Sequence, residues 1–170
     1  MYPIRTLLVP TDLSPDDEPV LDRAFELARQ TGARVHVLHV FDSLLRDLPP
    51  GEADSEATRA LRARMRTVAR DALDRIGARR AGAGVRVTVE QRLAPVPAPA
   101  IVACARDSSA DLIMMGTHDR GSLRRLLFGS VAEAVRAMRP CPVHVVPRAA
   151  SAPWGGSLSD VRERLRQALA

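Results

Sequence analysis

The sequence contains no lysine, few aromatic residues and only two cysteines, and each absence excludes a class of protein. All 25 basic residues are arginine, so a phosphate loop of the GxxxxGK[ST] type, which requires a lysine, is excluded. The two cysteines, Cys104 and Cys141, are too few for a disulfide scaffold and favour a reducing, cytoplasmic location. No apolar run approaches the roughly 20 residues of a membrane-spanning helix, so we expect no membrane association.

The low aromatic content and the positive net charge constrain the core and the partners. Only 3% of the residues are aromatic, whereas 46% of the 170 residues are hydrophobic. That content is enough for one domain with an aliphatic core. Although the net charge is +5, the sequence has neither a basic stripe with interleaved aromatic residues nor a recognised nucleic-acid-binding motif. We therefore expect no nucleic acid partner.

Short apolar runs alternate with amphipathic stretches along most of the chain. The apolar runs predict strands over residues 4–10, 33–40, 82–93, 111–116 and 142–146. The amphipathic stretches predict helices over residues 15–31 and 54–78, within 94–110, and from Ser130 to just before Pro140. Strands that alternate with helices predict an α/β fold, here a single open five-stranded parallel sheet with helices on both faces, Rossmann-like in its winding.

Capping and turn residues refine the predicted helices. Ser14 is predicted to be the N-cap of the first helix, with Pro15 at its first position and Asp17 three residues after the cap, and Gly32 is predicted to end it. The long second helix is predicted to turn one apolar face to the sheet. That face comprises Leu61, Met65, Val68, Ala72 and Ile76.

A change in composition after Pro147 predicts a boundary. Residues 1–147 form the predicted domain, and residues 148–170 form a linker followed by a short C-terminal amphipathic helix. Its apolar residues, Val161, Leu165 and Leu169, recur at helical spacing, but the helix is too short to be stable alone. We expect it to dock on its own domain or on a neighbouring subunit.

Ligands of open parallel sheets bind at the carboxyl ends of the strands, where the winding direction switches. Two loops of this chain are predicted to meet there. One follows the first strand and contains Pro10, Thr11 and Asp12. The other, "GTHDRGSLRRLLFGS", runs from Gly116 to Ser130 and leads from the fourth strand into the last helix of the core.

The second loop has the features of a phosphate cradle. Gly116 lets the backbone approach a ligand closely because it has no Cβ. Gly129 precedes a helix whose first amide groups are unpaired, so the amides of Ser130 and Val131 and the Ser130 hydroxyl are candidate phosphate donors. A second interpretation stays open, since Ser130 and Glu133 also form a capping box that needs no ligand.

At these residues the chain resembles the universal stress protein family, over about residues 1–147. The nucleotide-binding branch of that family has a glycine, two residues, a second glycine, nine residues and then Gly-Ser or Gly-Thr. Gly116 and Gly129-Ser130 match this spacing, but Asp119 stands where the family has its second glycine. The stretches "LLVPTDLS", "ADLIMMGTH", "GSVAEAV" and "CPVHVVP" carry further similarity.

This resemblance implies an adenine nucleotide alpha hydrolase-like fold and a regulatory role in the stress response, with ATP, AMP or ADP as ligand and Mg²⁺ as a candidate companion ion. It implies that Asp12 lies by the base and ribose, that Val40 packs on the base, and that members dimerise through the strand at 142–146. The full set of residues assigned to the cofactor is Pro10, Thr11, Asp12, Val40, Met115, Gly116, His118, Asp119, Gly129, Ser130 and Val131.

Catalysis and metal binding by the protein itself are not expected. His36 and His39 lie on one predicted strand but face opposite sides, which argues against a metal pair. No acid, base and nucleophile stand at recognisable spacing, so we expect no catalytic residues and at most a very slow ATPase. An adenylating enzyme of related fold would need an SGGxDS-like loop after the first strand, and "VPTDLSPDD" lacks it.

Asp119 leaves two functions open. A carboxylate about 5 Å from a phosphate oxygen costs on the order of 3 kcal/mol at an effective dielectric near 20, or roughly a hundredfold in affinity. One interpretation is a nucleotide-binding stress protein of weakened affinity, in which neighbouring arginines or Mg²⁺ offset that charge. The alternative is a member of the same family that binds no nucleotide and acts as a dimeric interaction module with an unknown protein partner.

Overall fold

The computed structural model describes residues 3–41, 55–81, 84–116 and 130–146 of the chain. Within these residues, parallel strands form one five-stranded sheet in the order β3-β2-β1-β4-β5. The strands are β1 (Thr6–Thr11), β2 (Arg34–Phe41), β3 (Val87–Leu93), β4 (Leu112–Gly116) and β5 (Val143–Val146). The helices are the short 3₁₀ turn η1 (Pro15–Asp17), α1 (Glu18–Thr31), α2 (Glu56–Ala81), α3 (Pro97–Asp107) and α4 (Ser130–Met138). The predicted α/β fold is confirmed.

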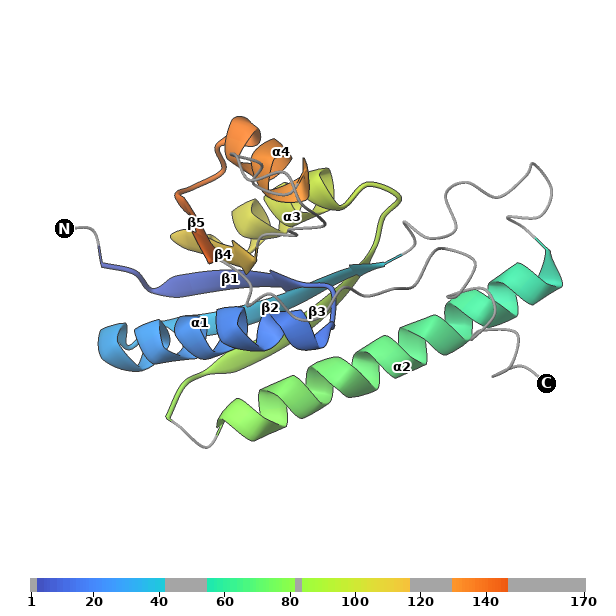
Figure 1. Cartoon of the computed structure of the whole chain (residues 1–170), viewed down its shortest axis with the longest axis horizontal. Helices are drawn as coiled ribbons and strands as arrows, with labels where there is room; N and C mark the ends of the chain where they lie inside the picture. Colours follow the sequence, from blue (N-terminus) through green and yellow to red (C-terminus); the bar gives the residue numbers. More distant parts are fainter. Residues whose placement is uncertain (1–2, 42–54, 82–83, 117–129, 147–170) are drawn as a thin grey trace.

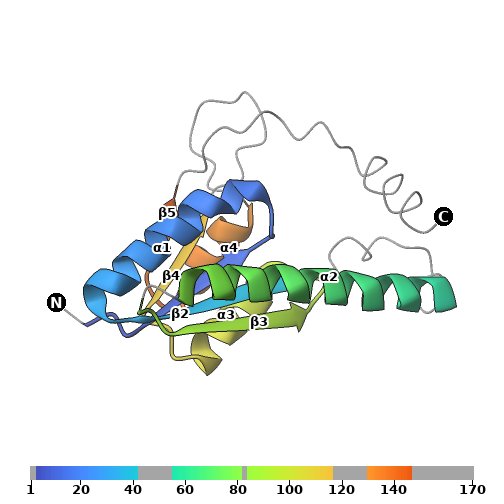
Figure 2. The same ribbon diagram turned by 90° about the horizontal axis from the view of Figure 1, so that it is seen from below.

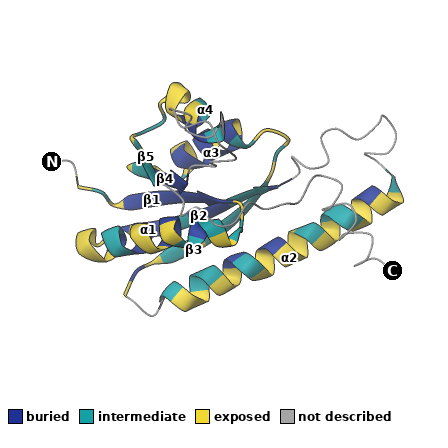
Figure 3. Ribbon diagram, viewed as in Figure 1, coloured by how far each residue is buried: buried dark blue, intermediate teal, exposed yellow. Residues whose placement is uncertain are grey.

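Helices cover both faces of the sheet, α1 and α2 one face and α3 and α4 the other (Figure 1). Each face has its own aliphatic cluster because successive side chains of a strand point to opposite sides. Along β1, Leu7 and Val9 belong to the cluster under α1, and Leu8 belongs to the cluster under α3. Every residue of β1 is buried, which makes it the centre of both clusters (Figure 3).

The start of the first helix differs in detail from the prediction. Pro15 opens a 3₁₀ turn, and Ser14 has the extended backbone of an N-cap. The hydroxyl of Ser14, however, makes no capping hydrogen bond, and the amide of Ser14 donates to the carboxylate of Asp12 at 2.9 Å. The predicted end is confirmed, since Gly32 takes a left-handed φ of 72° and its amide donates to the carbonyl of Ala28 at 2.9 Å.

The prediction for the apolar face of α2 is wrong at Val68. Figure 2 shows that α2 runs alongside β3 and extends beyond its end, so only part of the helix packs on the sheet. In that part the buried residues are Ala69 and Leu73, whereas the side chain of Val68 is 59% exposed. The other four residues of the predicted face, Leu61, Met65, Ala72 and Ile76, are half-buried, so the helix is only slightly rotated relative to that face. No helix in the described ranges is both long and apolar enough to cross a membrane.

Replacing Leu73 with alanine is expected to lower the free energy of unfolding by about 2–5 kcal/mol, because a fully buried leucine leaves a cavity under α2. The matched control is Val68→Ala on the same helix, which should change the stability by less than about 0.5 kcal/mol. Urea denaturation of the full chain measures both values. Equal losses from the two variants would contradict the observed orientation of α2.

Candidate functional site

The loop after β1 is held in place by one buried carboxylate, that of Asp17. Oδ2 of Asp17 accepts the hydroxyl of Thr11 at 2.7 Å and the amide of Asp12 at 2.9 Å. The oxygen of the Thr11 hydroxyl in turn accepts the amide of Leu13 at 2.9 Å, and Oδ1 of Asp12 accepts the amide of Ser14 at 2.9 Å. The loop is therefore built before any ligand arrives.

This network stabilises an unusual backbone at Leu13. Its φ of +64° lies in the left-handed region, which branched and bulky residues rarely enter. Asp17 is only 1% exposed, so its carboxylate acts where competition from water is weak. From the sequence we expected Asp17 to act only as a capping-box residue. It is instead the residue that shapes the loop, which a pattern of local spacing could not reveal.

The predicted switch point lies between β1 and β4. The two strands are neighbours, but their ladder is limited to the pairs Leu7–Leu112 and Leu8–Ile113, although β1 continues to Thr11 and β4 to Gly116. Pro10 has no amide hydrogen to donate in this region. The carboxyl ends of β1 and β4 therefore lie at the same end of the sheet, and no continuous ladder joins them there. Ligands of open α/β sheets occupy such a position.

Six of the predicted residues occupy the ends of β1, β2 and β4 or the loop that follows β1. Pro10 and Thr11 end β1, and Asp12 follows as an exposed residue. Val40 lies near the end of β2 and packs against the cluster under α3. Met115 and Gly116 end β4, and both are buried.

The remaining predicted residues belong to α4 or to the loop before it. Ser130 is the first residue of α4, and Val131 is half-buried against the cluster under α3. The side chain of Ser130, and all of His118, Asp119 and Gly129, lie outside the described residues. So do the linker and helix predicted for residues 148–170.

His39 is a further residue at the carboxyl ends of the strands, and the sequence does not assign it to the site. It pairs with Thr11 in the β1–β2 ladder, and its Nδ1 lies 2.9 Å from the Thr11 carbonyl oxygen, to which it donates. Burial lowers the pKa of His39 and outweighs both that hydrogen bond and the charge of Asp12. The ring is stacked with that of Phe41, with centroids 6.5 Å apart. His39 thus holds the end of β1 as an uncharged donor.

The fold defines the class of the protein: an α/β protein with one parallel sheet whose winding direction reverses between the neighbouring strands β1 and β4. The sequence model of the universal stress protein family matches residues 3–147. The chain belongs to the universal stress protein family. Members of this family are generally regulatory proteins rather than enzymes.

Individual relatives agree with this assignment. A universal stress protein of Methanocaldococcus jannaschii is 33% identical over 144 residues, which are 85% of this chain and 82% of the relative. The crystal structure of a protein of the family from Burkholderia pseudomallei has a TM-score of 0.67 and 29% identity, covering 86% of this chain and 98% of the other. A universal stress protein from Archaeoglobus fulgidus, solved in complex with dAMP, has a TM-score of 0.58 and 25% identity, covering 85% and 98%.

Replacing Asp17 with alanine is expected to lower the free energy of unfolding by about 1–3 kcal/mol, because two donors lose their buried acceptor. Asp71→Ala, at an exposed position on α2, is the control and should have an effect below about 0.5 kcal/mol. Urea denaturation measures both. If Asp17→Ala were as stable as the control, the carboxylate would not be what shapes the loop.

His39 makes the stability depend on pH. Its pKa lies below the ordinary value of 6.5 in the folded protein, so the unfolded chain binds a proton first as the pH falls. The stabilising contribution is therefore present above 6.5 and is lost on acidification, with a slope of at most about 1.4 kcal/mol per pH unit. His39→Gln should lessen the pH dependence of unfolding between about pH 7 and pH 5. An unchanged pH dependence in His39→Gln would refute this assignment.

Proposed function

We propose that the protein binds an adenine nucleotide at the switch point between β1 and β4 and that this binding serves a cytoplasmic regulatory role in the stress response. The observation that carries the proposal is that β1 and β4 are neighbours whose carboxyl ends lie at the same end of the sheet. In the sequence, a stretch from Gly116 to Gly129 connects β4 to α4. The dAMP bound by the Archaeoglobus fulgidus relative is a second support.

The proposed roles follow from the chemistry of each residue. The side chain of Val40 offers an apolar surface for the adenine base, and Asp12, at the end of a preformed loop, is an acceptor for ribose hydroxyls. The amino end of α4 supplies amides of Ser130 and Val131 for the phosphates. His118 would add a donor from the loop, and Mg²⁺ would bridge phosphate oxygens if the ligand is ATP.

A second candidate function is favoured by Asp119. Its negative charge stands in the segment proposed to surround the phosphates, and repulsion of about 3 kcal/mol would weaken binding roughly a hundredfold. If that cost prevents binding altogether, the protein is a dimeric interaction module. The dimer in either case is proposed to form through β5, an edge strand of the described sheet whose valines are half-buried. An edge strand presents unpaired backbone groups that a second copy can cover.

Calorimetric titration of the purified full chain with ATP and with AMP, in the presence of Mg²⁺, tests the proposal. We expect measurable binding by the wild type and about a hundredfold tighter binding of ATP by Asp119→Gly, because the repulsion is removed. Asp119→Asn is the matched variant. It removes the charge but keeps the Cβ, so equal gains from both substitutions assign the effect to charge.

Two results would contradict parts of this proposal. If neither the wild type nor Asp119→Gly binds an adenine nucleotide, and denatured protein releases none, the nucleotide-binding proposal is wrong and the interaction module is the function left to test. If both bind equally well, nucleotide binding stands, but the Asp119 carboxylate does not face the phosphates. Size-exclusion chromatography with light scattering, on the wild type and on Val145→Arg, tests the proposed β5 dimer independently.

A further inference from the structure

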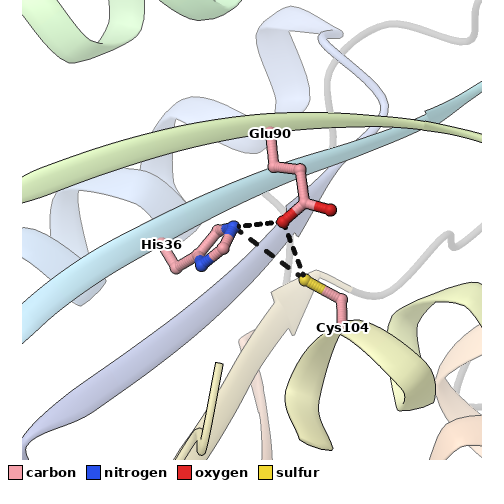
Figure 4. Close-up of side chains that lie close together, drawn as sticks. All are labelled: His36, Glu90 and Cys104. Atoms are coloured by element: carbon pink, nitrogen blue, oxygen red, sulfur yellow. Dashed lines mark hydrogen bonds and ion pairs between the residues drawn. The ribbon is translucent and has the colours of Figure 1, made fainter. Parts of the chain in front are cut away.

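Three side chains from separate elements converge between the sheet and α3, away from the proposed nucleotide site. They are His36 on β2, Glu90 on β3 and Cys104 on α3 (Figure 4). Nε2 of His36 lies 2.9 Å from Oε2 of Glu90 and 3.9 Å from Sγ of Cys104, and Sγ lies 3.6 Å from Oε2. An imidazole nitrogen, a carboxylate oxygen and a sulfur thus face one another around a common point.

This geometry is not that of a catalytic triad. In a triad the nucleophile and the acid contact opposite nitrogens of the histidine ring, whereas here Glu90 and Cys104 both approach Nε2. Burial and the charge of Glu90 also raise the pKa of the Cys104 thiol to about 12, which leaves it protonated and unreactive when no metal is bound. The cluster therefore does not assign a nucleophilic activity to Cys104.

The distances fit a tetrahedral metal ion. A zinc ion about 2.0–2.2 Å from nitrogen and oxygen and about 2.3 Å from sulfur holds its ligand atoms roughly 3.3–3.6 Å apart. The three observed separations, 2.9, 3.6 and 3.9 Å, bracket that range. Shifts of about half an ångström in side-chain positions would bring all three ligand atoms to bonding distance.

The surroundings orient one ligand and leave a path for an ion. Arg92 donates to Oε1 of Glu90 and is itself bound to Asp107 at 2.8 Å, so Oε2 is turned toward His36 and Cys104. Such outer partners fix the orientation of ligands in metal sites. A pocket of about 290 Å³ borders His36 and Glu90 and opens to solvent, while Cys104 is fully buried behind them.

We propose that His36, Glu90 and Cys104 form a site for Zn²⁺, with water from the pocket as the fourth ligand. On binding, the thiol loses its proton to solvent and the imidazole proton moves from Nε2 to Nδ1, so that Sγ, Nε2 and Oε2 each donate a lone pair. When bound, the ion links β2 and the edge strand β3 to α3. A thiolate ligand favours zinc over magnesium, which separates this site from any Mg²⁺ bound with a nucleotide.

Cobalt titration of the full chain tests the proposal without nucleotide. After removal of metal with a chelator, and with a reductant that has no thiol, one equivalent of Co²⁺ should produce a thiolate-to-cobalt charge-transfer band and the strong visible bands of a tetrahedral ion. One equivalent of Zn²⁺ should abolish these bands. Cys104→Ala should remove the charge-transfer band, and His36→Gln and Glu90→Gln should each weaken Co²⁺ binding at least about tenfold.

Cys141→Ala and His144→Gln are the matched controls, and both should keep the spectrum. Because Cys104→Ala could disturb the fold, thermal unfolding of the wild type provides a second readout. Zn²⁺ should raise its Tm, and Mg²⁺ at the same concentration should not. Absence of the charge-transfer band, its persistence in Cys104→Ala, or its loss in Cys141→Ala would overturn the proposal. None of these outcomes depends on whether the protein binds a nucleotide.

Discussion

The structure depends on the burial of β1 between two helical layers. All six residues of this strand are buried, and aliphatic side chains from it reach both core clusters. A strand covered on both faces must have neighbours on both edges to satisfy its backbone groups. With β2 on one side of β1 and β4 on the other, the chain has to reverse its winding beside β1. The reversal separates the carboxyl ends of β1 and β4, and a ligand is proposed to bind between them.

The two proposed sites use this architecture in different ways. The proposed nucleotide site, at the carboxyl ends of β1 and β4, combines the loop held by Asp17 with the amino end of α4. Its proposed phosphate donors are mainly backbone amides, because the chain has no lysine. The cluster of His36, Glu90 and Cys104 uses side chains only, and it exists because α3 crosses over β2 and β3 on the opposite face from α1.

Most of the architecture could be predicted from the sequence because its signals are local. Apolar runs such as residues 4–10 indicate buried strands, and Gly32 ends α1 as predicted because a left-handed residue is needed there. The face of α2 was predicted wrongly at Val68, because a helix that packs along only part of its length can rotate to bury Ala69 and Leu73. The stripe of apolar residues alone does not determine that rotation.

The sequence by itself therefore determined the order of strands and helices, the parallel sheet, the family and the turn that follows β1. Only the tertiary structure decided that Asp17 holds the first loop, that His39 supports the end of β1, and that His36 lies beside Glu90 and Cys104. For Asp17, which is near its partners in sequence, the physical reason is burial: whether its carboxylate faces water or the loop depends on the packing around it. For the two histidines the reason is distance along the chain. Local patterns record periodicity and capping, whereas contacts between residues far apart in sequence depend on strand register and on the crossing of helices over the sheet.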